Sequence, residues 1–323
     1  MYRPGLTLAL LLLAPLTICL AMLVGSVHLG WSDLRQALTG EGTGIPATLI
    51  FELRLPRALG AFAVGGMLAL AGTLLQVLLR NPLADPYILG VSGGAAVAAM
   101  LSMLFGLGAG WVMGGALGGS LLSMVLVFGL AHARGAWTPM RLLLTGVVVA
   151  AGWGAVISFI LAISPNHDLH GMLFWHLGDL SHSRHPLIGN LVLLTGLILA
   201  FPLARALNLL ARGELTAAAL GENPLRLKIA IYFLASLLTA AAVSIAGSIG
   251  FVGLIIPHML RLIGGTDHRL LLPNAALLGG SFLVFADTLA RTLLAPVQLP
   301  VGVITALLGV PVFLYLLNRG QQP

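Results

Sequence analysis

Long runs of apolar residues, separated by short polar segments, form the dominant pattern of this chain. A helix needs about 20 apolar residues to cross the core of a bilayer. Most of the runs have that length, and they predict about ten membrane-spanning helices, over residues 6–29, 58–79, 87–107, 111–132, 142–163, 187–207, 229–249, 251–263, 274–294 and 300–317. The eighth run is short and contains Pro257, so we expect a broken or tilted helix there.

Composition restricts the chain to one class. Of its 323 residues 59% are hydrophobic and 8% are charged, and the mean hydropathy is +1.03. Soluble domains carry about a quarter charged residues, so the sequence predicts an all-α polytopic membrane protein with residues 1–323 as one transmembrane domain. Cys19 is the single cysteine, which excludes an intramolecular disulfide. The net charge of +6 is spread over single basic residues between the runs, and it does not indicate nucleic-acid binding.

Residues 53–94 contain the unit on which the rest of the chain is built. An apolar, Gly-rich run without a charge covers residues 58–79, between Arg54 and Arg57 on one side and Arg80 on the other. Pro56 and Pro82 mark the start and the end of the predicted helix. Ala71, Gly72 and Pro82 recur 175 residues later as Ala246, Gly247 and Pro257, which suggests two inverted halves.

Basic residues predict the orientation. With ten crossings and a cytoplasmic N-terminus, eleven lysines and arginines lie inside and five outside, in agreement with the positive-inside rule. Both termini are then cytoplasmic. The five outside are arginines that anchor at lipid headgroups or contact an acidic partner, namely Arg35, Arg54, Arg57, Arg184 and Arg291.

The chain lacks the residues that would let it drive transport alone. A P-loop requires Gly-Lys-Ser/Thr, and the only lysine, Lys228, stands between Leu227 and Ile229. Ion-coupled carriers keep ionisable groups inside their spans. Here Asp287 is the one acid well inside a run, and Arg291 lies one helical turn further on. The energy source is therefore expected on another subunit.

Eight ordered blocks make the chain resemble the permease subunits of type II ABC importers for cobalamin (vitamin B12), ferric siderophores and haem, over nearly its whole length. They include RLPR (residues 54–57), RNPLADPYILGVSGG (80–94), RLLLTGV (141–147), GELTAAALG (213–221), GFVGLIIPHMLRL (250–262), TDHRLLLP (266–273), ADTLAR (286–291) and LPVGVITALLGVPVFLYLL (299–317). The resemblance implies a homodimer in the cell inner membrane, two cytoplasmic ATPase subunits and a periplasmic binding protein, with no nucleic acid and no cofactor. It also implies a transport subunit and not an enzyme.

The resemblance assigns roles at the two faces. The segment 208–226, which the residues themselves predict as a short helix stopped by glycine and proline, matches the helix that couples to the ATPase, at Gly213, Glu214, Ala218, Leu220 and Gly221. It could equally be a plain connector. Arg54, Arg57 and Arg291 match arginines that dock the binding protein. The alternative places Arg54 and Arg57 at lipid headgroups and pairs Arg291 with Asp287.

The same resemblance implies a gated pathway. Two cytoplasmic turns match its constrictions, namely Asn81, Pro82 and Leu83 in the first and Thr138, Pro139 and Met140 in the second. Polar residues of the fifth and tenth runs, Thr145, Ser158 and Thr305, would line the pathway. As alternatives, Asn81-Pro82 is only a helix stop, and each hydroxyl bonds to its own helix backbone.

Histidines gather in one outside segment, where the resemblance implies a short periplasmic helix over residues 168–180. His167, His170, His176, His182 and His185 could contact a haem or a metal, but no cysteine or carboxylate set accompanies them, so no resident metal is expected. Phe174 and Trp175 would be interfacial anchors.

The sequence thus predicts a permease for a metal chelate, a ferric siderophore or haem, with cobalamin as the alternative. An intramembrane hydrolase is the rival class. It would need HExxH, which is absent, or a serine nucleophile, for which Ser92 is the only loose candidate.

Overall fold

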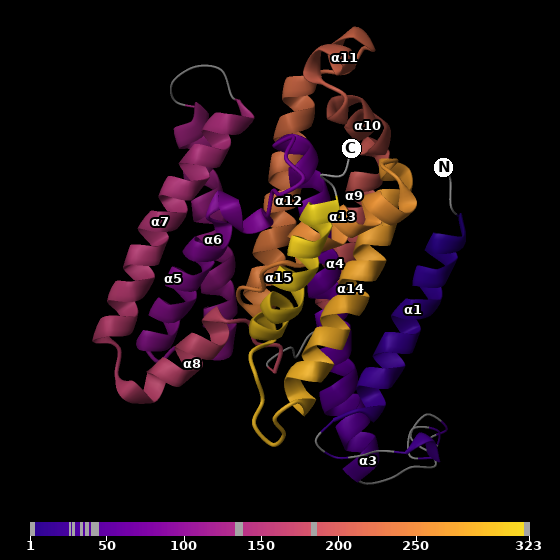
Figure 1. Ribbon diagram of the computed structural model, residues 1–323. Helices are drawn as coiled ribbons and strands as arrows, with labels where there is room; N and C mark the ends of the chain where they lie inside the picture. The colour runs from indigo at the N-terminus through magenta and orange to yellow at the C-terminus, as the bar shows by residue number, and fades with distance from the viewer. Residues whose placement is uncertain are drawn as a thin grey trace.

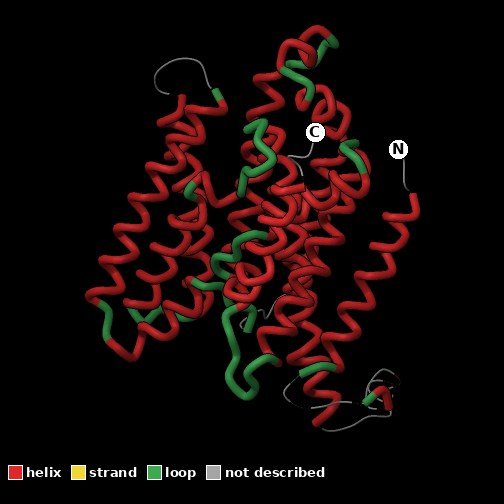
Figure 2. The backbone as a smooth tube through the Cα atoms, in the orientation of Figure 1, coloured by secondary structure: helices red, strands yellow, loops and turns green. Residues whose placement is uncertain are grey.

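The computed structural model describes residues 4–25, 27, 30–32, 35, 39, 45–132, 138–181 and 186–319, with side chains placed up to residue 315. In these ranges the chain consists of helices and loops, without strands (Figure 2). The predicted all-α class is therefore confirmed for the part described. In chain order the helices are α1 (Pro4–Leu23), α3 (Ile45–Thr48), α4 (Leu55–Leu78), α5 (Val91–Leu104), α6 (Ala109–His132), α7 (Pro139–Ile163), α8 (Asn166–His176), α9 (Pro186–Ala200), α10 (Ala204–Ala211), α11 (Glu214–Ala219), α12 (Pro224–Ala246), α13 (Val252–Gly264), α14 (His268–Thr292) and α15 (Val301–Arg319).

Seven helical stretches in the described residues are long and apolar enough to cross a membrane. They are Gly5–Leu23, Ile45–Leu78, Ala109–His132, Pro139–Ile163, Pro186–Ala211, Pro224–Ala246 and His268–Thr292. Three predicted spans coincide with the shorter apolar helices α5, α13 and α15.

Helix α4 is the centre of the molecule. From Ala58 to Leu78 every residue except Leu59 and Phe62 is buried, and α4 contacts α1, α9, α12, α13 and α14. Figure 1 shows these helices gathered around α4, while α5, α6, α7 and α8 lie together at the left, where α5 and α6 contact α12. The stretch that the sequence singled out as organising is thus the most enclosed helix in the fold.

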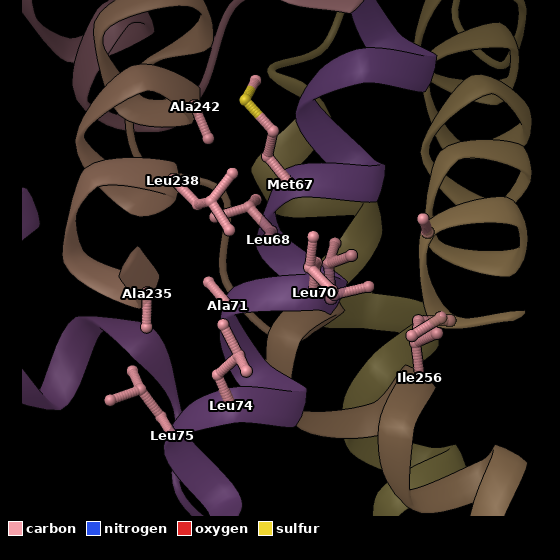
Figure 3. Close-up of a cluster of buried hydrophobic side chains, with 14 of the residues drawn as sticks. Met67, Leu68, Leu70, Ala71, Leu74, Leu75, Ala235, Leu238, Ala242 and Ile256 are labelled. Carbon is pink, nitrogen blue, oxygen red and sulfur yellow. The ribbon is translucent and has the colours of Figure 1, made fainter. Parts of the chain in front are cut away.

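Small residues let α4 approach its neighbours closely. A Cβ atom built on Gly72 would overlap the backbone of Gly253 in α13, and one on Gly65 would overlap the backbone of Gly279 in α14. Large side chains fill the gaps beside these contacts. Figure 3 shows Leu68 and Leu75 of α4 beside residues of α12, with Ile256 of α13 nearby. Close backbone packing of this kind is the usual means by which membrane helices associate.

Several predicted boundaries are wrong, and the causes are local. The span predicted from residue 87 begins with a 3₁₀ turn, η2 (Pro86–Leu89), and α5 starts only after Gly90, which has φ of +71°. The helix expected over 168–180 is Asn166–His176, and it is followed by Gly178 with φ of +90°. The span predicted from residue 274 begins at His268, because the Asp267 side chain caps the helix by accepting from Arg269 N.

Two further helices differ from expectation. Helix α13 runs unbroken from Val252 to Gly264 with Pro257 inside it, so of the two expected forms, broken or tilted, the broken one is absent from this described segment. The span predicted over 187–207 is not one continuous α-helix. Helix α9 ends at Ala200, and a 3₁₀ turn, η3 (Phe201–Leu203), joins it to α10.

The helix directions place the sites at two opposite ends. Helix α1 begins, and α15 ends, at the end of the molecule where α10 and α11 lie, and α3 and α8 lie at the other end (Figure 1). Helix α4 runs from the α3 end to the α11 end, and α12 runs back. In the following, these ends are called the α11 end and the α8 end.

Candidate functional site

At the α8 end, one buried carboxylate holds two of the three predicted docking arginines. Arg57 donates to Asp287 from Nε at 3.0 Å and from Nη2 at 2.8 Å, and Arg291 donates to it from Nε at 3.1 Å. The Asp287 side chain is 2% exposed, while those of Arg57 and Arg291 are 13% and 10% exposed. The predicted Asp287–Arg291 pair is confirmed, and Arg57 is a second partner that the sequence did not indicate.

The third arginine has a different environment. Arg54 is buried, and its Nη1 donates to the carbonyl oxygens of Met22 at 2.8 Å and Leu23 at 3.0 Å. Its Nη2 donates to the carbonyl oxygen of Val27. The Met22 and Leu23 carbonyls belong to the end of α1, where backbone acceptors have no partner in their own helix, and Val27 follows the helix. Arg54 therefore caps α1, and it would have to release these carbonyls to reach another protein.

At the α11 end, the predicted coupling segment forms a short helix between two glycines with positive φ. Gly213 has φ of +132° and Gly221 of +86°, and Pro224 begins α12. Ala218 and Leu220 are exposed, as is Leu215, whose side chain is the most exposed of the large apolar ones at 87%. A short helix that presents apolar side chains to solvent offers a contact surface for a partner.

Two basic residues hold Glu214 of this helix. Its Oε2 accepts from Lys228 Nζ at 3.0 Å, and its Oε1 lies 3.3 Å from Arg80 Nη2. Lys228 belongs to α12, and Arg80 directly follows α4. From the sequence, both cations were predicted only to lie on the cytoplasmic side. Their pairing with Glu214 could not be predicted, because no local pattern connects residue 80 with residue 214. Glu214 thus links α11 to the ends of α4 and α12.

The two predicted gate turns lie side by side. Leu79 and Asn81 line one hollow of about 480 Å³ together with Thr138, Pro139, Met140 and Leu143. Residues of both turns also make local structural contacts. Asn81 Oδ1 accepts from Leu83 N at 2.9 Å in the turn after α4, and Thr138 caps α7 by accepting from Arg141 N at 3.3 Å. Pro82 lines a different cavity, which is described below.

The three predicted pathway residues have different exposures. Ser158 is exposed and Thr145 is half-buried. Thr305 is fully buried within the single chain. Ser158 Oγ donates to Gly154 O at 2.9 Å, and Thr305 Oγ1 donates to Gly302 O at 3.0 Å. Both hydroxyls therefore bond to the backbone of their own helix, as the alternative interpretation predicted.

The described histidines of the α8 end, His167, His170 and His176, do not converge. His167 lies 3.4 Å from Asp168, and the His170 ring packs at a tilt against Phe174, with 4.5 Å between ring centroids. Partial burial lowers the pKa of His176. His182 and His185 lie outside the described residues. Within the described ranges no group of three or more His, Cys, Asp or Glu side chains could hold a metal ion.

Comparison with known proteins places the chain in a family. The profile of the FecCD transport family matches residues 11–319. The chain belongs to the FecCD transport family. This confirms the resemblance inferred from the sequence blocks, and it makes the chain a transport component and not an enzyme.

Individual relatives in this family cover nearly the whole chain. The hemin transport system permease protein HmuU of Yersinia pestis is 40% identical over 330 residues, 99% of this chain and 97% of HmuU. The cobalamin import system permease protein BtuC of Halobacterium salinarum is 44% identical over 281 residues, 85% of this chain and 75% of BtuC. A solved structure of a metal-chelate type ABC transporter in an inward-facing conformation is 32% identical, with a TM-score of 0.87 over 98% of this chain and 100% of the other.

Proposed function

We propose that this FecCD family member is the permease subunit of an ATP-driven ABC importer for a metal chelate. Two copies would form the pathway in the cell inner membrane, with two ATPase subunits at the α11 end and a periplasmic binding protein at the α8 end. The short helix α11 carries the proposal, because its exposed apolar residues are available to a partner while Glu214 links it to the central helix α4. Displacement of α11 by a partner would therefore reach α4 directly.

Ten spans per chain fit this proposal. The seven long helices together with α5, α13 and α15 account for them, and the chain then starts and ends on the cytoplasmic side, which is the α11 end. Residues 1–323 would form one permease domain. The opposite directions of α4 and α12 agree with two inverted halves.

The chelate proposed is a ferric siderophore or haem, with cobalamin as the alternative. Relatives named for hemin and for cobalamin are both about equally similar, at 40% and 44% identity. The pathway would be closed below the substrate by the two turns that share the hollow around Asn81 and Thr138. Thr145 and Ser158 would contribute hydroxyl groups to the wall of the pathway. Thr305 would do so only after a rearrangement that exposes its side chain.

The experiment that tests the function is reconstitution in liposomes with the ATPase and the binding protein. We expect uptake of the chelate that requires ATP and all three components, and calorimetry of the binding protein with each chelate identifies the substrate. Uphill uptake by the permease alone without ATP would contradict the proposal.

Docking through Arg57 is tested by Arg57→Gln. The amide still donates to Asp287 but lacks the positive charge, so we expect stimulation of ATP hydrolysis by the binding protein to fall about tenfold, the loss of one charge-assisted contact. ATPase assembly should stay intact. Arg35→Gln, at an exposed arginine predicted on the same side, is the control. Full stimulation of the Arg57 variant would refute this docking role.

A further inference from the structure

A second cavity, of about 500 Å³, lies at the α11 end beside Arg80 and the predicted gate residue Pro82, and the function proposed above assigns it no ligand. It is formed where four helices begin or end, with Gln76 from α4, Asn208 from α10, Arg261 from α13 and His268 from α14 in its walls. Pockets for small organic ligands have volumes of about 300 to 1,000 Å³. The cavity could therefore hold more than a bare inorganic ion.

Positive charge predominates in its walls. Arg80, Arg212 and Arg261 line the cavity, against one carboxylate, Asp267. Arg80 pairs with Glu214, but in the described part of the chain neither Arg212 nor Arg261 forms an ion pair. Two guanidinium groups beside one cavity thus lack a protein carboxylate, and arginine is the side chain best suited to phosphate.

Buried polar contacts hold Arg261 in place. Its Nη1 donates to Oε1 of Gln76, a side chain that is 4% exposed. Nε2 of Gln76 donates to the carbonyl oxygens of Gly253 at 3.3 Å and Leu254 at 3.1 Å. Since both carbonyls accept, the Gln76 amide can only turn its oxygen toward Arg261. The guanidinium is therefore fixed at the cavity wall before any ligand arrives.

The carboxylate of the cavity already has partners. Asp267 Oδ1 accepts from Asn208 Nδ2 at 2.8 Å and from Arg269 N at 3.0 Å. The hydrogen bond from Asn208 lowers the pKa of Asp267, so this carboxyl is ionised at neutral pH. Its charge stabilises the positive N-terminal end of α14, as a helix cap does. Among the described residues Asp267 forms no ion pair with Arg212 or Arg261.

His268 adds an unpaired polar atom. The Asn208 oxygen accepts from His268 N at 2.9 Å and faces its Nδ1 at 2.6 Å, so Nδ1 carries the proton. The Nε2 atom of this 2% exposed side chain has no hydrogen-bond partner in the described ranges. Because Nδ1 carries the proton, this unsatisfied Nε2 is an acceptor, and it fits a hydroxyl group of a ligand and not a phosphate oxygen.

We propose that this cavity binds a phosphate ester, with Arg212, Arg261 and Arg80 as the groups that recognise its phosphate. The ester would come from the glycerophosphate headgroup of an anionic lipid or from a soluble phosphate ester. The site lies where two candidate membrane spans, Pro186–Ala211 and His268–Thr292, have one of their ends, beside Arg212 and Asp267. Headgroup phosphates lie at the level where spanning helices end.

The test uses the full chain in nanodiscs of phosphatidylcholine. One arm titrates glycerol 3-phosphate by calorimetry. The other adds phosphatidylglycerol to the bilayer and counts, by native mass spectrometry, the molecules that stay bound after release from the disc. Arg212→Gln and Arg261→Gln are compared with Arg205→Gln, which removes the same charge from α10 outside the cavity. Arg212 is exposed, so its variant keeps the fold even if Arg261→Gln does not.

We expect each cavity variant to weaken binding roughly tenfold, the usual size of one charged hydrogen bond, while Arg205→Gln binds as the native protein does. Such a loss in the first arm supports a soluble ester, and in the second arm a lipid headgroup. Absence of binding in both arms, or an equal loss in the Arg205 control, overturns the proposal.

Discussion

Replacement of Glu214 by lysine is expected to abolish ATP-driven uptake in the reconstituted importer. The native carboxylate lies 3.0 Å from Lys228 Nζ and 3.3 Å from Arg80 Nη2, so the variant would bring three cations together and separate α11 from α4. The Lys228 side chain is 7% exposed, but those of Glu214 and Arg80 are 36% and 41% exposed, and ion pairs with a partly exposed partner contribute only about 0 to 1 kcal/mol to stability. The chain should therefore fold and insert, and the loss should appear in coupling.

The measurement compares uptake with ATP hydrolysis in liposomes of equal permease content. Glu222→Lys is the matched control, because it reverses a charge in the same segment and Glu222 forms no ion pair among the described side chains. We expect the control to transport normally, whereas the Glu214 variant retains less than a tenth of native uptake, as complete loss of one coupling contact implies. Equal uptake by both variants would remove the coupling role of Glu214.

Replacement of Asp287 by alanine is expected to destabilise the fold strongly. It leaves Arg57 and Arg291 largely buried without the carboxylate that they share. Removal of one partner from a buried ion pair costs about 3–5 kcal/mol, because the remaining charge is desolvated and uncompensated. We expect a large fall in the thermal unfolding temperature of the purified protein and a low yield.

A second substitution separates this cause from the loss of packing. In Asp287→Ala with Arg57→Gln only one uncompensated charge remains, so we expect part of the lost stability to return. Asp168→Ala, at a carboxylate whose side chain is 30% exposed, should leave the unfolding temperature nearly unchanged. If the double variant is no more stable than Asp287→Ala alone, the stability lost in Asp287→Ala does not come from the uncompensated charges of the arginines.

Prediction from sequence succeeded where a property is local. An apolar run long enough to span a bilayer must form a helix, because unpaired backbone groups are too costly in lipid. This is why the predicted bounds of α4 and α12 lie close to those in the structure. The short helix between Gly213 and Gly221 follows from a different local signal, namely the glycines and the proline that end it. The turn before α5 and the early start of α14 were missed, since they depend on Gly90 and Asp267, whose effects an apolar run does not show.

The roles of single polar residues were much harder to predict. Arg54 and Arg57 are neighbours in one motif, yet one caps α1 and the other pairs with Asp287, 230 residues away. Asn81 and Thr138 were assigned to two gate turns, and only the fold shows that the turns share a hollow.

The sequence by itself determined that this chain is a helical membrane transport component, since hydrophobic run length and composition leave no other way to satisfy the backbone, and since the motif blocks belong to one family. Only the tertiary structure decided which charges neutralise each other: Asp287 with Arg57 and Arg291 at the α8 end, and Glu214 with Arg80 and Lys228 at the α11 end. Charge pairing acts over a few ångströms in space, and separation along the chain does not reveal that distance.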